Sequence, residues 1–228
     1  SSGDGKNANL VAQLETESLA DKAAEFKTTN NDDTIGWIRI PNTNVDYPVV
    51  YKAGVENYAY YESKGYDKQY SKDGVIWADY ECTFPELSQN TTLYGHNWHN
   101  IYTPRTQANM QANDLMFSLV MSYNYTDFAQ ENPFIYFSTT EQDYVFQVFA
   151  SYYTDLNFGY DYAQMSQEDF QKVIAEAKAK SLSNYNVPVT SEDKIVTLST
   201  CTRVHGNTNN QRFVVMAKLV PVGTPSTT

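Results

Sequence analysis

The sequence contains little cysteine and no long apolar run, and each shortage excludes a class of protein. Only two of its 228 residues are cysteines, Cys82 and Cys201, so it has neither a disulfide framework nor a paired-cysteine zinc or redox motif. No run of about 18 apolar residues occurs, and residues 1–5 show neither the basic nor the apolar part of a signal peptide. We therefore expect any anchoring or export segment to be missing from this sequence.

Positive charge is also scarce. Sixteen Lys and Arg face 27 Asp and Glu, which gives a net charge of −11 and an isoelectric point near 4.6. This sign is wrong for a surface that neutralises phosphates, so nucleic-acid binding is not expected. The 41% hydrophobic and 14% aromatic content is too high for a disordered chain, and the mean hydropathy of −0.54 shows no membrane character. One globular domain follows from these values.

The residue pattern after position 35 is mainly that of β-strands. β-branched and aromatic runs bounded by turn residues lie at 37–40, 45–51, 75–77, 91–94, 134–137, 144–152, 195–200 and 213–220. Helical spacing appears at 10–26, at 115–123 behind a cap at Asn113 or Asp114, and at 166–182 behind a capping-box sequence. The pattern predicts a mainly β barrel or sandwich with helical decoration.

Cys201 stands where a reactive thiol is useful. It ends an apolar strand and precedes a loop rich in glycine and asparagine, so its thiol lies on a rigid element beside an opening. The alternative is a small core residue, which is the commoner role of a free cysteine. Because the thiolate is the nucleophile, a reactive Cys201 needs a base or a cation nearby.

Three histidines and one arginine are candidates for that help. His96 follows strand 91–94 at a position that mirrors Cys201, which makes it the preferred base. His205, four residues after Cys201, is the rival, although a solvated loop imidazole is the simpler interpretation for it and for His99. Arg212 opens the last strand, where its guanidinium either stabilises a thiolate and an oxyanion or is simply solvated.

Several segments together resemble the sortases, which are cysteine transpeptidases of Gram-positive cell surfaces. Thr197-Leu198-Ser199-Thr200-Cys201 matches the TLxTC signature, Leu93-Tyr94-Gly95-His96-Asn97 resembles the histidine strand, and Arg212-Phe213-Val214-Val215 resembles the arginine strand. Segments 35–41, 45–50 and 74–80, the helix before the cysteine strand and the N-terminal helix resemble class B members. The resemblance runs from Ile35 to Val220.

The resemblance implies an eight-stranded β-barrel with the cysteine and arginine on adjacent strands and the histidine across a cleft. Cys201 is then the nucleophile that forms a thioester with the threonine carbonyl of a sorting pentapeptide. His96 is the acid toward the leaving amine and the base toward the incoming amine, and Arg212 holds the oxyanion and substrate. Ser199, Thr200 and Asn97 are expected to bind substrate. No cofactor and no metal are implied.

The same resemblance suggests a layout and a setting. It divides the chain into a helical extension at 1–34, a catalytic domain at 35–220 and a disordered tail at 221–228. The enzyme is expected on the extracellular face of a Gram-positive membrane, with its anchor absent from this sequence. Its partners are a surface protein or pilin with a sorting signal, and the amine of a peptidoglycan precursor or of a pilin lysine. Cell-wall anchoring is preferred over pilin polymerisation.

Some features depart from the family pattern and keep other functions open. Thr202 and Arg203 stand where class B enzymes often have an acidic residue, so no Cys-His-Asp triad is expected there. The polar segment 100–111 looks long enough to reshape the mouth of the cleft. A plain thiol hydrolase and a non-catalytic binding module remain alternatives, and the module has a tyrosine-rich segment at 58–70 in its favour. Cys82 matches no motif, and a bridge to Cys201 would block the nucleophile.

Overall fold

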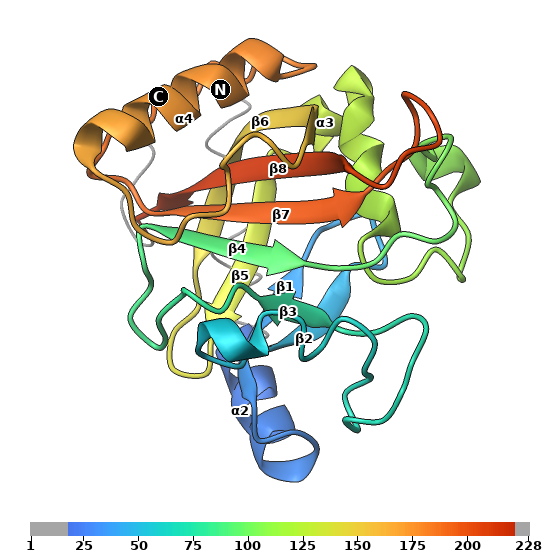
Figure 1. Ribbon diagram of the computed structural model, residues 1–228, viewed down its shortest axis with the longest axis vertical. Coiled ribbons are helices and arrows are strands. Elements are labelled where there is room, and N and C mark those ends of the chain that lie inside the picture. The colour runs from blue at the N-terminus through green and yellow to red at the C-terminus, as the bar shows by residue number, and fades with distance from the viewer. Residues whose placement is uncertain (1–17, 222–228) are drawn as a thin grey trace.

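Eight strands close into a β-barrel in the computed structural model, which describes residues 18–221 (Figure 1). The strands are β1 (Thr34–Arg39), β2 (Asp46–Val50), β3 (Ile76–Ala78), β4 (Asn90–Tyr94), β5 (Phe134–Thr139), β6 (Val145–Asp155), β7 (Ile195–Cys201) and β8 (Gln211–Val220). Their order around the barrel is β1-β2-β3-β4-β7-β8-β6-β5, with parallel pairing only for β2·β3 and β4·β7. The predicted mainly β, eight-stranded barrel is confirmed.

Successive side chains of β7 and β8 point alternately into the barrel and toward its outer face. Val196 and Leu198 of β7 join Phe213 and Val215 of β8 in the interior core. The residues between them therefore point outward, because successive side chains of a strand face opposite sides. Cys201 belongs to this outward set, together with its partner on β8.

Helix α4 (Gln167–Lys180) covers part of the outer face, above β6 and β8 in Figure 1. The side chain of Ser166 caps it by accepting the N–H of Asp169 over 3.1 Å, as the predicted helix start requires. Phe170, Ile174 and Ala177 share one face of the helix and are buried in a second core cluster.

Helix α2 (Leu19–Thr29) packs against β1 and β5 at the opposite end of the molecule from α4 (Figure 1). Ser18 caps it, and Leu19, Ala20 and Ala23 form its buried side. It accounts for the later part of the N-terminal helix predicted at 10–26, whose first residues lie outside the described part of the chain. It also lies within the helical extension expected at 1–34.

The segment 107–131 differs from its prediction. The structure has the 3₁₀ helices η2 (Gln107–Asn109) and η3 (Ser118–Asn124) followed by a short α3 (Thr126–Glu131), in place of one helix at 115–123. Asp114 is not a helix cap there, because its carboxylate accepts the Gln111 N–H over 2.7 Å and pairs with Arg105 over 2.8 Å. A further 3₁₀ turn, η1 (Val55–Asn57), lies between β2 and β3.

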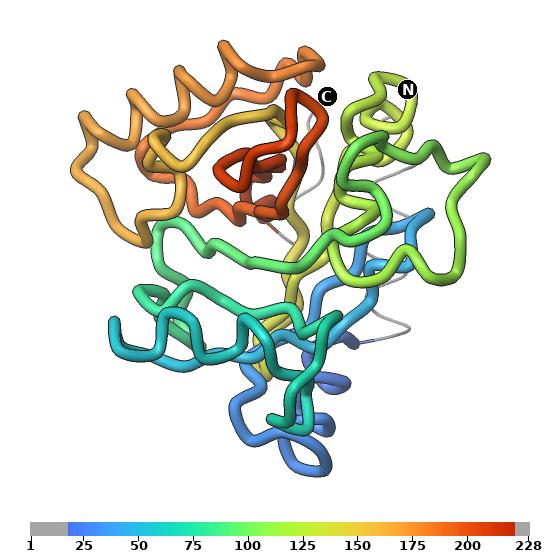
Figure 2. Tube along the Cα trace, turned by 45° about the vertical axis from the view of Figure 1, so that its right-hand side comes forward, coloured from blue at the N-terminus to red at the C-terminus, as the bar shows by residue number. Residues whose placement is uncertain are grey.

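Two loops that are far apart in the sequence meet at the C-terminal ends of β4 and β7. The loop after β7 and the loop after β4 run side by side in Figure 2, and the Arg203 N–H donates to the Ile101 carbonyl over 2.6 Å. No helix within residues 18–221 has the length and apolar character that a membrane crossing needs. The two loops frame the strand ends that carry the candidate site residues.

Candidate active site

Cys201 and Arg212 lie directly opposite each other on neighbouring antiparallel strands. The register of β7 and β8 pairs these two residues, and both side chains are partly buried. Residues paired in this way project from the same face of a sheet. The expectation that the last two strands are neighbours is therefore confirmed, and a thiol and a guanidinium project from one side of the barrel. The thiol of Cys201 is free, so no bridge joins it to Cys82.

His96 reaches the same place from β4. In the parallel pairing of β4 and β7, Tyr94 stands opposite Ser199. His96 and Cys201 each follow that pair by two residues, and the Gly95 N–H continues the ladder by donating to the Ser199 carbonyl over 3.3 Å. The three candidate catalytic residues thus come from the ends of three successive strands, β4, β7 and β8.

The imidazole of His96 is held between two indoles and a main-chain carbonyl. Its ring centroid lies 5.5 Å from that of Trp98 and 5.7 Å from that of Trp77. Its Nε2 lies 2.5 Å from the carbonyl oxygen of Glu62. Because a carbonyl oxygen only accepts, this contact requires a proton on Nε2 and leaves Nδ1 for proton exchange. Gly74 allows the close approach, since a Cβ there would lie 2.8 Å from His96 Cδ2.

This contact supplies an orienting group that the sequence does not reveal. The sequence lacks an acidic residue directly after Cys201, and Thr202 in that place is buried, with its hydroxyl directed to the Ile101 carbonyl over 3.3 Å. The Glu62 carbonyl fixes one ring nitrogen of His96, as a carboxylate does in a triad. No side-chain motif encodes it, because any residue at position 62 carries the same carbonyl group.

The guanidinium of Arg212 is fixed by backbone oxygens. Its Nη1 donates to the carbonyls of Asn209 over 2.9 Å and of Gln211 over 2.8 Å. Arg212 has no other hydrogen-bond or ion-pair partner within residues 18–221, so Nε and Nη2 remain as donors. Such preorganised donors suit the stabilisation of an oxyanion that develops at the thiol.

The residues expected to bind substrate are instead bonded to the protein. Ser199, Thr200 and Asn97 are each only 2% exposed. The Thr200 hydroxyl donates to the Gly95 carbonyl over 2.8 Å, and the Asn97 amide donates to the Cys201 carbonyl over 3.2 Å. The Thr200 hydroxyl hydrogen and one amide hydrogen of Asn97 are therefore already used within the protein. The arrangement favours a role in holding the strand ends in register.

Tyr160 contacts a candidate site residue, and sequence reasoning missed it. It lies in the segment between β6 and α4, and its hydroxyl is 2.8 Å from the Ser199 hydroxyl. Burial raises the pKa of Tyr160 to about 12, with smaller opposing effects from its bond to Ser199 and the charge of Arg212. The phenol therefore keeps its proton at neutral pH. Its only sequence signal is a tyrosine- and glycine-containing stretch before a helix cap, which is too common to indicate a site.

A second tyrosine ties the same segment to β4. The Tyr94 hydroxyl lies 2.7 Å from Asp79 Oδ2 and 3.0 Å from Asp161 Oδ2. Burial and the two carboxylates raise the pKa of Tyr94, so it remains a neutral donor. Burial also raises the pKa of Asp79, against the lowering effect of its hydrogen bonds from the Glu81 N–H and from Tyr94. One phenol proton thus serves two carboxylates.

The rival histidines lie in other environments. His205 is exposed and packs edge-on against Tyr153, with ring centroids 4.6 Å apart. Tyr153 pairs with Phe213, whose side chain faces the barrel interior, so His205 packs on the side opposite to Arg212 and Cys201. His99 is exposed in the loop after His96. Neither follows the Tyr94–Ser199 pair as His96 does.

The second cysteine, Cys82, differs from Cys201 in its surroundings. Cys82 is 2% exposed, and burial raises the pKa of its thiol to about 12. A thiol with this pKa stays protonated and unreactive at neutral pH.

No group of three or more His, Cys, Asp or Glu side chains within the described residues is arranged to hold a metal ion.

Comparisons with known proteins agree with this arrangement. A family model described as Sortase domain matches residues 38–220. Sortase B of Staphylococcus aureus (strain NCTC 8325 / PS 47) is 31% identical over 193 residues, which are 84% of this chain and 72% of that protein.

Two solved structures are similar over almost the whole chain. A Staphylococcus aureus sortase B–substrate complex is 27% identical with a TM-score of 0.74 and covers 96% of this chain and 94% of that one. A sortase B complexed with Gly3 is 26% identical with a TM-score of 0.71 and the same coverage.

Proposed function

The chain belongs to the sortase family as a class B cysteine transpeptidase, and on that premise we propose that it cleaves a C-terminal sorting signal after threonine through a thioester on Cys201. The observation that supports this most strongly is the row of strand ends. Cys201 pairs with Arg212, and His96 and Cys201 both follow the Tyr94–Ser199 pair. This row gathers a nucleophile, a base and a fixed cation on one face.

In the first half-reaction the Cys201 thiolate attacks the threonine carbonyl carbon and a C–S bond forms. The carbonyl oxygen becomes an oxyanion, which the free donors of Arg212 stabilise. The C–N bond then breaks, and His96 gives a proton to the leaving amine. The product is a thioester on Cys201 together with the released C-terminal peptide.

In the second half-reaction an acceptor amine attacks the thioester carbon. A C–N bond forms, the C–S bond breaks with its electron pair leaving on sulfur, and His96 takes the proton that the amine loses. The thiolate of Cys201 is restored. The solved sortase B structures hold a substrate in one case and Gly3 in the other, which supports a peptide donor and an amine acceptor for this chain.

We place this reaction at the extracellular face of a Gram-positive membrane, where the donor is a surface protein with a sorting signal. The preferred acceptor is the amine of a peptidoglycan precursor, and a pilin lysine is the second candidate, since the same three residues serve both. Supplying labelled sorting peptide with either a stem-peptide amine or a pilin lysine separates them. Turnover with the pilin alone would reverse the preference.

Variants test the chemistry itself. We expect Cys201→Ala to abolish both cleavage and transfer, and His96→Ala to lower kcat by about 10²–10⁴-fold, the usual worth of a placed acid–base group. Arg212→Ala should lower kcat by about 10²–10³-fold through loss of the oxyanion donor. His205→Ala is the matched histidine control and should keep full activity. Cleavage by Cys201→Ala would reject the enzyme mechanism.

Two other functions have less support. A tyrosine-rich binding face would need the tyrosines of segment 58–70 on one surface, but Tyr61 is buried and donates to Asp33 over 2.6 Å, while Tyr66 donates to the Pro48 carbonyl over 2.7 Å. Only Tyr58 and Tyr70 of this set are strongly exposed. A plain thiol hydrolase would release the peptide without transfer even with amines present, which the same assay detects.

A further inference from the structure

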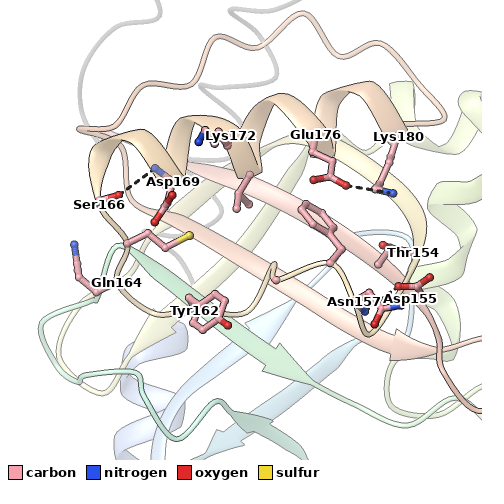
Figure 3. A pocket seen from close by; sticks show the side chains of 14 residues that line it. Thr154, Asp155, Asn157, Tyr162, Gln164, Ser166, Asp169, Lys172, Glu176 and Lys180 are labelled. Atoms are coloured by element: carbon pink, nitrogen blue, oxygen red, sulfur yellow. Dashed lines mark hydrogen bonds and ion pairs between the residues drawn. The ribbon is translucent and has the colours of Figure 1, made fainter.

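A groove of about 680 Å³ lies between α4 and the segment 154–166 that leads to it, and we call it the β6–α4 groove (Figure 3). Its lining residues come from both elements. In the middle of the segment, Tyr160 bonds with Ser199 and Asp161 bonds with Tyr94, so these two side chains turn away from the groove. The segment 154–166 therefore lies between the groove and the part of the outer barrel face that carries Tyr94 and His96.

One end of the groove lies two strands away from the proposed nucleophile. Thr154, which lines the groove, pairs with Arg212 across β6 and β8, and Arg212 pairs with Cys201 across β8 and β7. These three residues stand in one row on the same face of three successive strands. Because neighbouring strands are about 4.8 Å apart, the backbone of Thr154 is roughly 10 Å from that of Cys201. A ligand that leaves the groove at Thr154 would therefore reach the thiol by passing Arg212.

The floor of the groove is apolar. Phe158, Met165 and Val173 line it and pack against the core cluster beneath α4. Gly159 and Tyr162 complete the wall on the side of the segment, and the Tyr162 side chain is 54% exposed. A floor of this kind accommodates an extended chain rather than a single ion.

The charges of the groove are unbalanced. Its two lysines are already paired with glutamates, Lys180 with Glu176 over 3.6 Å and Lys172 with Glu168 over 3.1 Å. Asp155 accepts only the Asn157 N–H, over 2.8 Å, and neither Asp155 nor Asp169 forms an ion pair within residues 18–221. Figure 3 shows Asp155 at the Thr154 end and Asp169 near the start of α4. The unpaired charge favours a cationic ligand.

We propose that the β6–α4 groove binds the amine-bearing peptide that accepts the acyl group, with its ammonium drawn by Asp155 toward the Cys201 end. This inference rests on the proposed transpeptidation. The bound ammonium loses one proton to solvent before it reacts. Its nitrogen then attacks the thioester carbon, the C–S bond to Cys201 breaks, and the second proton passes to His96.

The test compares a large and a small acceptor. The donor is the fastest member of a fluorogenic peptide library with a fixed threonine, and the acceptors are triglycine and hydroxylamine, the second of which is too small to need the groove. We expect Asp155→Asn and Asp169→Asn each to raise the KM for triglycine about 2- to 5-fold, and the double variant about tenfold. The KM values for hydroxylamine and for the donor should not change. Glu25→Gln, an exposed single-charge change on α2, is the matched control.

A second variant tests the groove without changing its charge. Val173→Phe narrows the floor and should raise the KM for triglycine alone, with a thermal melt to show that the barrel still folds. The proposal is overturned if triglycine and hydroxylamine respond alike, if neither responds to the double variant and to Val173→Phe, or if the donor KM changes instead.

Failure of the proposed function has a separate readout. Without any acceptor, the wild-type protein and the groove variants should all form the same acyl-enzyme, detected as a mass increase on Cys201. Absence of that adduct in the wild-type protein rejects the thioester mechanism. Its presence, together with an unchanged triglycine KM in the groove variants, rejects the groove alone.

Discussion

The side-chain amide of Asn97 donates a hydrogen bond to the backbone carbonyl of Cys201 over 3.2 Å. In the parallel ladder of β4 and β7, the Gly95 N–H already donates to the Ser199 carbonyl, and the next rung would join residue 97 to Cys201. Asn97 provides that rung from its side chain, and its Oδ1 accepts the Asn100 N–H over 3.0 Å. A buried amide thus ties the loop after His96 to the end of the Cys201 strand.

Replacing Asn97 by Asp removes the donor, keeps an oxygen for the Asn100 N–H and turns a buried acid group toward the Cys201 carbonyl. We expect kcat to fall about 10- to 100-fold, because a displacement of the two strand ends by a fraction of an ångström disrupts proton transfer between His96 and the substrate. The KM for the donor should change little, since Asn97 is buried. Steady-state kinetics separate the two parameters.

The matched control for this change is Asn184→Asp, an exposed asparagine in the segment between α4 and β7. It should leave kcat unaltered. A loss of stability in Asn97→Asp with an unchanged kcat at a temperature where the variant is folded would show that the amide supports the fold without positioning the reacting groups.

Thr200 provides a second side-chain tie between the same two strands. Its hydroxyl donates to the Gly95 carbonyl over 2.8 Å, in a fully buried place. Thr200→Val keeps the shape but leaves that carbonyl unpaired, which should cost about 1–3 kcal/mol of unfolding free energy in urea titrations. Thr200→Ser keeps the hydroxyl and should lose less. Equal losses in the two variants would contradict a role for the bond.

Much of the barrel is predictable because the strand runs are rich in β-branched and aromatic residues and are bounded by turns. The run before Cys201 is β-branched throughout much of its length, and the cap and buried face of α4 follow from Ser166, Phe170 and Ile174. The segment 118–124 is different. Six of its seven residues are buried, so no apolar stripe distinguishes an α-helix from the 3₁₀ helix that forms.

The candidate site, like the fold, is predictable from the sequence only in part. Positions at strand ends, together with the family motifs, single out His96, Cys201 and Arg212 from the sequence. The partners of the neighbouring polar residues do not follow from it, because Thr200 bonds to a residue 105 positions earlier and Tyr160 to one 39 positions later. Because Ser199 and Thr200 stand next to Cys201 in the sequence, they are predicted to contact substrate. In the structure their hydroxyls form hydrogen bonds within the protein.

The two cysteines should react very differently with thiol reagents. Cys201 is partly exposed at a strand end, whereas Cys82 is buried and its pKa is raised to about 12. We expect iodoacetamide to label Cys201 alone in the native protein and both cysteines in urea, as peptide mass mapping can show. Labelling should abolish activity, and Cys82→Ala should retain it. Native labelling of Cys82 would contradict the buried position.

The carboxyl of Asp79 should contribute less to stability at neutral pH than at low pH. Burial raises its pKa above the ordinary value of 3.8, with Asp161 and Glu81 as the nearby charges that add to this effect. As the pH rises through 3.8, the carboxyl of Asp79 ionises in the unfolded chain but stays protonated in the folded protein. The contribution of Asp79 to the unfolding free energy therefore falls between pH 3.8 and the raised pKa, and it stays lower above that value.

Asp79→Asn removes this penalty and keeps the local bonds. Its Oδ1 still accepts the Glu81 N–H, and its amide donates to the Tyr94 oxygen, so the phenol proton goes to Asp161 alone. We expect a gain of about 1.4 kcal/mol per unit by which the pKa is raised at pH 7, and this gain shrinks as the pH approaches 3.8. Urea titrations across this range measure it. A variant that is less stable than the wild type at pH 7 but equally stable below pH 3.8 would show that the fold stabilises the Asp79 carboxylate, which would contradict the raised pKa.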